Sequence, residues 1–117
     1  MHYMETTVWK KAMVLAEAAC RNAARLPDEE RFGIRLQITR AAVSVASNIA
    51  EGWTRESKNE RRQFLAVAHG SLSELHTQLL LCDRLHWLPQ ESLIVSFGLI
   101  DEISRMLTTL RQRARPR

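Results

Sequence analysis

Two groups of cationic side chains are the residues of this sequence best suited to bind a ligand. Residues 54–62 carry four basic and two acidic side chains, and the last seven residues carry four arginines and no acid. Such clusters attract polyanions, and guanidinium groups bind phosphate through paired N–H donors. We therefore expect binding to the phosphate backbone of RNA or DNA by these residues: Arg55, Lys58, Arg61, Arg62, Arg111, Arg113, Arg115 and Arg117. The alternative is that these charges only keep the chain soluble and complement helix dipoles.

Trp53 is the one aromatic residue beside these cations that could stack on a base. We expect it instead to be buried at one end of the fold or in an interface. The arginine-rich segment 111–117 has no interleaved aromatic residue. Contacts to phosphate alone are therefore expected there, and four of them on a single strand predict a log–log salt slope of about −2.8.

A narrow stripe of polar residues runs along one side of an otherwise apolar segment, residues 37–51. The spacing of three and four is that of an α-helix. The residues of the stripe, with the glycine that follows it, are Arg40, Ser44, Asn48, Glu51 and Gly52. We expect a structural or interface seam, in which Asn48 bonds to backbone and neighbours across helices or subunits neutralise Arg40 and Glu51. A ligand-binding role is the alternative.

The sequence gives little support for metal-dependent or nucleophilic catalysis. Cys82 and His86 are four residues apart and could share a zinc ion, but no second ligand pair has metal-binding spacing. A di-iron bundle requires Glu-x-x-His pairs, and the sequence has none. The serines lie in helical segments without a nucleophile elbow, and no glycine-rich phosphate loop occurs. We expect no metal, no cofactor and no enzymatic activity.

Four helices must position these residues. Apolar residues recur at helical spacing over residues 5–25, 29–51, 58–87 and 90–113. Pro27 and Pro89 separate helices, Gly52 is expected to end the second one, and Ser57 with Glu60 predicts a capping box at the third. The predicted core stripes are Val8, Ala12, Leu15, Ala19, Ala23 and Leu26; Ile34, Ile38, Ala42, Val45 and Ile49; Phe64, Ala68, Leu72, Leu75, Leu79 and Cys82; and Leu93, Phe97, Ile100, Ile103, Leu107 and Leu110.

Short connections between long helices require neighbouring helices to be antiparallel. The predicted fold is therefore all-α, a single domain over residues 1–117 with the topology of an up-down-up-down four-helix bundle. The second helix has too little polar surface to face water on one side. We expect it to be packed on two sides, which leaves room for a contact with another subunit.

Gly70 admits two interpretations. It could form the turn of a helix-turn-helix motif, with Ser71 capping a recognition helix. Against this, the apolar stripe crosses Gly70 in register, and the following segment carries Glu74 and Asp83 against one arginine, Arg84. We favour a glycine that allows close approach of two helices.

The composition fits a cytoplasmic protein. No apolar run approaches the roughly 18 residues of a membrane span, and the N-terminal residues lack the pattern of a signal peptide. The two cysteines, Cys20 and Cys82, lie in apolar helical stretches, where buried reduced thiols are expected rather than a disulfide.

Residues 40–52 also carry a family resemblance. Their sequence, RAAVSVASNIAEG, closely resembles the signature of the four-helix-bundle proteins encoded in intervening sequences of 23S ribosomal RNA genes, a family that includes the accessory proteins of diversity-generating retroelements. Residues 9–12 resemble the motif of that family's first helix, and residues 29–38 resemble the start of its second. Ser57, Glu60 and residues 70–79 resemble its third.

The resemblance implies a non-enzymatic bundle that assembles into a ring, typically a homopentamer. The retroelement branch is similar to a scaffold that binds nucleic acid and a reverse transcriptase. Five chains of charge +4 would together carry +20, which strengthens weak binding patches through multivalency. We expect a homo-oligomeric scaffold that binds RNA or DNA. The alternatives are a protein-interaction adaptor without direct nucleic-acid binding and a helix-turn-helix regulator.

Overall fold

Four helices make up most of the chain in a computed structural model, which describes residues 2–30 and 32–115. They are α1 (Thr7–Ala24), α2 (Ile34–Thr54), α3 (Lys58–Arg84) and α4 (Gln90–Arg113). Two short 3-10 turns, η1 (Tyr3–Glu5) and η2 (Asp28–Glu30), precede α1 and α2. Within the described ranges the chain forms no strand, and the all-α prediction is confirmed.

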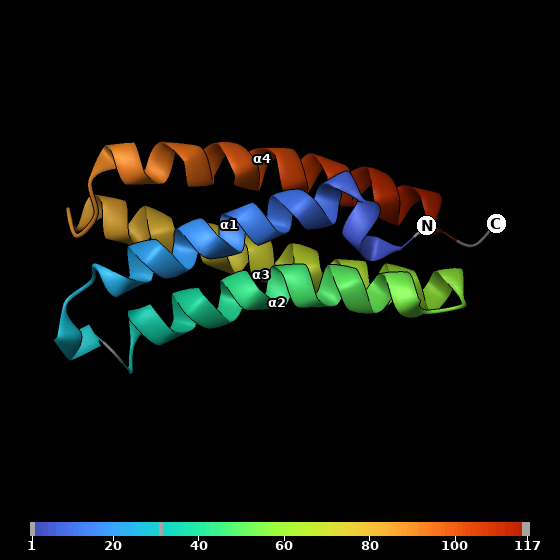
Figure 1. The fold of residues 1–117 in the computed structure, drawn as a ribbon, viewed down its shortest axis with the longest axis horizontal. Coiled ribbons are helices and arrows are strands. Elements are labelled where there is room, and N and C mark those ends of the chain that lie inside the picture. The colour runs from blue at the N-terminus through green and yellow to red at the C-terminus, as the bar shows by residue number, and fades with distance from the viewer. Residues whose placement is uncertain (1, 31, 116–117) are drawn as a thin grey trace.

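The helices lie side by side in an elongated bundle, 47 Å long and 23 to 24 Å across (Figure 1). Each helix packs on two others, in the order α1, α2, α3, α4 and back to α1. Figure 1 shows the terminal segments and the α2–α3 connection at one end, with the α1–α2 and α3–α4 connections at the other. The predicted four-helix bundle is therefore observed.

Contacts between α1 and α4 demonstrate their antiparallel course. Near the end of α1, Asn22 Nδ2 donates to the carbonyl oxygen of Ser92, 3.0 Å away at the start of α4. Near the start of α1, Lys11 pairs with Glu102, which lies further along α4. The later residue of α1 therefore contacts the earlier residue of α4, and the earlier residue of α1 contacts the later one. This pattern requires the two helices to run in opposite directions.

The core consists of the predicted apolar stripes. The α1 stripe is buried over its whole length, and Leu15 is 1% exposed. On the other three helices most stripe residues are also buried, while Ile34, Phe97 and Leu110 pack partly exposed against the core. Phe64, predicted as a core residue, is only half-buried, and its neighbour Leu65 is buried instead. Leu80 and Leu85, apolar residues at the end of α3 outside these stripes, are 41% and 45% exposed.

The apolar character of α2 is explained within a single chain. This helix packs on both α1 and α3, and its small residues Ala41, Ala42 and Ala46 are buried together with its large ones. Val43, 48% exposed, is the large hydrophobic side chain that α2 leaves in solvent. The expected packing on two sides is thus supplied by neighbouring helices, and contact with another subunit is not needed to account for it.

Several helix ends differ from the sequence-based boundaries. The second helix begins at Ile34 rather than near residue 29, because Gly33 has φ −102° and ψ −119°, outside the helical region. The third helix ends at Arg84 rather than 87, because His86 has a left-handed φ of 57°. The first helix begins at Thr7, where Thr6 caps it by accepting from the backbone N–H of Trp9. The predicted N-cap of the third helix is confirmed, since Ser57 Oγ accepts from the Glu60 N–H at 3.0 Å.

Neither Gly52 nor Gly70 has the role predicted for it. Gly52 does not end α2, which continues to Thr54; instead, a Cβ built on Gly52 would lie 3.2 Å from Cβ of Phe64 on α3. Gly70 lies within the unbroken helix α3, so there is no helix-turn-helix at this point. A Cβ on Gly70 would meet no atom within 4 Å, so the expected close approach at this residue is also wrong. The close approach of two helices is at Gly52.

Candidate nucleic-acid interface

The bundle brings the two predicted cationic groups together at one end, which we call the basic end. Arg55, Lys58, Arg61 and Arg62 lie between the end of α2 and the first turns of α3, while Arg111, Arg113 and Arg115 lie at the end of α4. Arg117 lies outside the described residues. The antiparallel topology causes this meeting, because the start of α3 and the end of α4 must share one end of the bundle.

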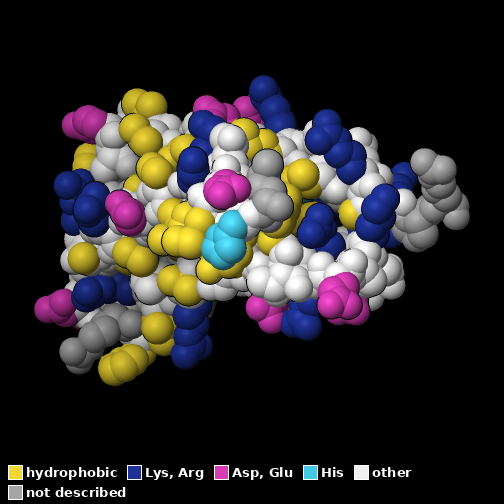
Figure 2. Space-filling model, turned by 45° about the vertical axis from the view of Figure 1, so that its right-hand side comes forward, with side chains coloured by type: hydrophobic (Ala, Val, Ile, Leu, Met, Phe, Trp, Pro, Cys, Tyr) yellow, Lys and Arg dark blue, Asp and Glu magenta, His cyan; other side chains and the backbone are white. Residues whose placement is uncertain are grey.

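Two surface pockets show which of these cations are neighbours. Arg62 of α3 lines one of about 160 Å³ together with Arg111 and Arg115. Lys58 and Arg61 line another of about 290 Å³ together with Arg113. Neither lining includes a carboxylate. Figure 2 brings this end of the molecule forward and shows lysine and arginine side chains spread over it, while hydrophobic side chains gather on the other half of the visible face.

Arg55 and Arg61 already have partners within the protein. Arg55 pairs with Glu51, Nη2 to Oε1 at 2.6 Å, and its guanidinium carbon lies 4.7 Å from the centroid of the Phe64 ring. Arg61 lies 4.8 Å from the centroid of a Trp53 ring and donates to the carbonyl oxygens of Gly52 and Trp53. Since those carbonyls belong to the last turn of α2, Arg61 helps to close that helix. Both arginines therefore hold the α2–α3 corner together.

Arg111 is held by a histidine that the sequence analysis did not identify. Its Nη1 lies 3.0 Å from Nδ1 of His69, and Nε2 of the same ring lies 2.9 Å from Oγ of Ser104. Because arginine only donates hydrogen bonds, Nδ1 must accept, so the proton is on Nε2 and is donated to Ser104. Burial, and then the charge of Arg111, lowers the pKa of His69. The histidine is therefore neutral at pH 7 and fixes Arg111 between α3 and α4.

The side chains of four of the predicted cations have no ion-pair or hydrogen-bond partner in the part of the chain that the structure describes. Lys58, Arg113 and Arg115 are exposed and Arg62 is half-buried. Among the residues that the structure describes, none of the four forms an ion pair or a side-chain hydrogen bond. A cation without a partner can bind an anion without first breaking an internal contact, so these four are the strongest candidates for a phosphate interface.

The polar stripe on α2 forms a seam against α3. Ser44 Oγ lies 2.7 Å from Oγ of Ser71, and Asn48 Nδ2 donates to both the carbonyl oxygen and Oγ of Ser44. The expected bond from Asn48 to backbone is confirmed. The small side chains at Ser44 and Gly52 let α3 lie close to α2, so this part of the stripe has a clear structural role.

The charged members of the stripe lie outside that seam. Glu51 is paired with Arg55, four residues further along the chain, rather than across helices as expected. Arg40 is exposed and has no ion-pair partner in the part of the chain that the structure describes. The hypothesis of a ligand-binding role for the stripe stays a prediction.

Among the described residues, no cluster of side chains is arranged as a metal site or as a reactive thiol site. Within those ranges no three His, Cys, Asp or Glu side chains are grouped to hold a metal ion. Cys82 is buried in the core, where burial raises the pKa of its thiol, while His86 is exposed beyond the end of α3. Both cysteines are free. In the same residues no helix is long and apolar enough to span a membrane.

Sequence reasoning found the cations but missed His69 and Ser104. The contacts of His69 join residues far apart in sequence, 42 residues from Arg111 and 35 from Ser104, and give no short-range pattern. The signal was in the topology: once α3 and α4 are taken as antiparallel neighbours, a residue about three turns into α3 lies opposite the last turns of α4. The pockets were missed for the same reason, because each is lined from more than one helix.

Comparison with known proteins agrees with this architecture. The model of a family described as 23S rRNA-intervening sequence protein matches residues 4–109. The match ends just before Arg111, the first residue of the arginine-rich segment 111–117. A crystal structure of a protein with unknown function from the S23 ribosomal protein family of Bacteroides thetaiotaomicron has the same fold, with a TM-score of 0.83. It is 22% identical in sequence, and the match covers 91% of this chain and 99% of that chain. No curated protein matches the chain.

Proposed function

We propose a function for this chain, which belongs to the family of 23S rRNA-intervening sequence proteins. It is a non-enzymatic homo-oligomeric scaffold that binds RNA or DNA. Binding takes place through phosphate contacts at the basic end. The observation that supports this function is the meeting there of four cations, Lys58, Arg62, Arg113 and Arg115, that form no ion pair or side-chain hydrogen bond within the described ranges 2–30 and 32–115. Backbone phosphates are the ligands that such a surface attracts independently of sequence.

Exposed apolar residues on α3 support the oligomeric part of the proposal. Val67, Leu81 and Leu85 are 53%, 47% and 45% exposed. Their spacings of 14 and 4 residues place them on one side of the helix, which we call the α3 stripe. Exposed apolar side chains on one side of a helix are candidates for a protein contact, here with the exposed Glu74 between Val67 and Leu81 on the same side. A ring of five, the assembly that the family resemblance implies, would present five basic ends and add their weak contacts together.

A second candidate function follows from the same stripe. The ring could be a protein-interaction adaptor whose α3 stripe receives another protein, such as a reverse transcriptase, without direct binding to nucleic acid. This function needs the apolar surface but not the free cations. It therefore predicts weak, nonspecific affinity for polyanions.

Fluorescence anisotropy distinguishes the two functions. RNA and DNA oligomers are titrated with the protein over a series of salt concentrations. We expect dissociation constants in the micromolar range or below. Four phosphate contacts per chain predict that a plot of log association constant against log salt concentration has a slope of about −2.8 or steeper on single strands. Flat titrations at low salt would reject nucleic-acid binding and leave the adaptor.

A further inference from the structure

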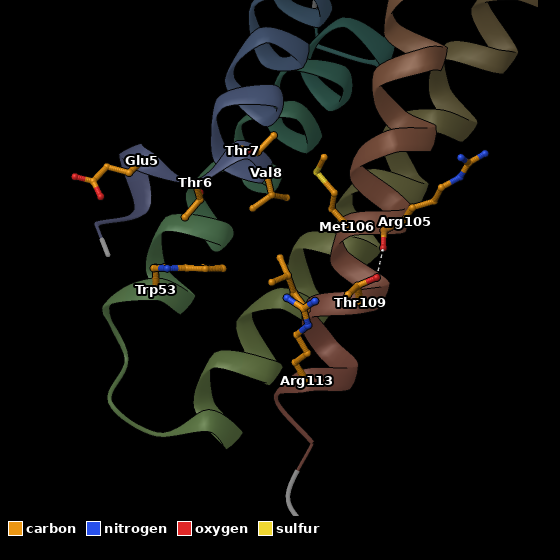
Figure 3. A pocket seen from close by; sticks show the side chains of 10 residues that line it. Glu5, Thr6, Thr7, Val8, Trp53, Arg105, Met106, Thr109 and Arg113 are labelled. Atoms are coloured by element: carbon orange, nitrogen blue, oxygen red, sulfur yellow. Dashed lines mark hydrogen bonds between the residues drawn. The ribbon is translucent and has the colours of Figure 1, made fainter.

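A large pocket opens beside the basic end, between the start of α1, the end of α2 and the last turns of α4. Its volume is about 570 Å³, within the range of small-ligand sites. The floor is apolar and is formed by Val8, Trp53, Met106 and Leu110. Figure 3 shows Trp53, Val8 and Met106 directed into this space from three different helices, with Arg113 reaching in from α4. In the same view Glu5 and Arg105 point away from it.

This pocket lies next to the smaller pocket of about 290 Å³ at the basic end. The two share Trp53, Leu110 and Arg113 in their linings. The smaller one adds Lys58 and Arg61. An apolar, aromatic cavity thus joins a cationic surface, and Arg113 lies at the boundary. That pairing of a flat apolar site with adjacent cations matches a nucleotide, which has a planar base beside a charged phosphate.

The indole of Trp53 is held in place for such a contact. The Arg61 guanidinium lies 4.8 Å from the centroid of a Trp53 ring, and the carbonyl oxygen of Trp53 accepts from the same arginine. Trp53 is half-buried and packs against the core, yet it lines both pockets. A fixed aromatic surface binds a base with little loss of side-chain entropy.

We propose that the 570 Å³ pocket receives one unpaired base of a single-stranded nucleic acid, while Arg113 and Lys58 bind the neighbouring phosphates. The inference rests on the proposed function and narrows its ligand from nucleic acid in general to single strands. Paired bases cannot enter, because their faces are covered by the stack.

The test compares three DNA probes of about 12 nucleotides: a thymidine single strand, a strand of abasic residues with the same phosphates, and a duplex. Anisotropy titrations are made at one salt concentration. We expect the thymidine strand to bind about tenfold more tightly than the abasic strand. Thr109→Phe, which places a ring in the pocket, removes that preference without changing affinity for the abasic strand.

Thr77→Phe is the matched control. Both threonines are exposed on a helix and donate to the carbonyl oxygen four residues earlier, at 3.2 Å for Thr109 and 2.9 Å for Thr77. Thr77 lines neither pocket, so its variant keeps the tenfold preference.

Each contrary outcome has a distinct meaning. Equal, salt-dependent affinity of the native protein for thymidine and abasic strands overturns the base pocket and leaves phosphate binding intact. No binding of any probe at low salt overturns both. A change of oligomeric mass in Thr109→Phe alone, measured by light scattering, also overturns the inference, because a neighbouring copy then covers the pocket.

Discussion

His69 is the residue whose protonation state the structure determines most clearly. Its Nδ1 accepts from Arg111, and an imidazolium has no lone pair with which to accept. The ordinary pKa of 6.5 is lowered by burial and by Arg111. The unfolded chain therefore binds this proton at a higher pH than the folded chain, and the free energy of unfolding falls as pH drops below about 6.5.

We predict that His69→Gln reduces this pH dependence. Urea unfolding at pH 7.5, 6.5 and 5.5 gives the loss of stability on acidification for both proteins. Protonation of carboxylates changes the free energy of unfolding equally in both proteins. The difference between the two pH profiles is therefore the contribution of His69. The native protein should lose more stability than the variant between about pH 6.5 and 5.5. Parallel pH profiles would show that His69 is not held neutral by its surroundings.

His86 is strained in a way that glycine would relieve. It has a φ of 57°, while the Trp87 N–H returns to the Cys82 carbonyl oxygen at 3.0 Å to close α3. Glycine adopts this conformation without the steric cost that Cβ imposes. We predict that His86→Gly raises the free energy of unfolding by about 1 kcal/mol. The same substitution at His76, inside α3, should lower it by at least about 0.5 kcal/mol, and stabilisation at both positions would contradict the explanation.

At the scale of the elements, the contact between α2 and α3 depends on small residues. The Cβ of an alanine at position 52 would lie 3.2 Å from Phe64 Cβ and 3.4 Å from the Arg61 carbonyl oxygen. Neither neighbour is the flexible end of a side chain, so the helices must separate. We predict that Gly52→Ala lowers the free energy of unfolding by about 1 to 3 kcal/mol in thermal or urea unfolding.

Gly98→Ala provides the opposite control. Gly98 lies inside α4 with no atom within 4 Å of a built Cβ. Alanine there should stabilise the protein by about 0.5 to 1 kcal/mol through helix propensity alone. Equal effects of the two substitutions would show that Gly52 is not a close-contact position.

The helices themselves were predictable, but their ends and corners were not. The stripe from Val8 to Leu26 specifies a buried helix face because one period extends over five turns. Gly52 and Gly70 were misjudged because a glycine in sequence does not reveal what lies opposite it. The start of α2 at Ile34 could not be predicted, because it depends on the backbone conformation of Gly33.

The candidate site was predictable in composition but not in geometry. Charge clustering identified Lys58, Arg62, Arg113 and Arg115, and the antiparallel topology placed them together. The same clustering included Arg55 and Arg61, whose partners Glu51, Phe64 and Trp53 divert them to a structural role. Only three-dimensional contacts separate the two kinds of arginine.

At the scale of the whole molecule, the α3 stripe predicts self-association. Leu81→Lys places a charge in that stripe, so it should dissociate the assembly, whereas Val14→Lys on α1 changes an equally exposed residue outside it. Sedimentation should give about 67.5 kDa for five copies of the 13.5 kDa chain in the native protein and the control, and a lower mass for Leu81→Lys. A native mass near 13.5 kDa would contradict the oligomeric part of the proposal.

The most direct test of the central claim compares two triple variants that lose the same charge. Arg62, Arg113 and Arg115 are replaced by alanine at the basic end. The control replaces Arg21, Arg25 and Arg84, which are exposed at the opposite end. The salt dependence of single-stranded RNA binding is measured for each. We predict a log–log slope shallower by about 2 for the basic-end variant and an unchanged slope for the control. Equal slopes for both variants would contradict binding at the basic end.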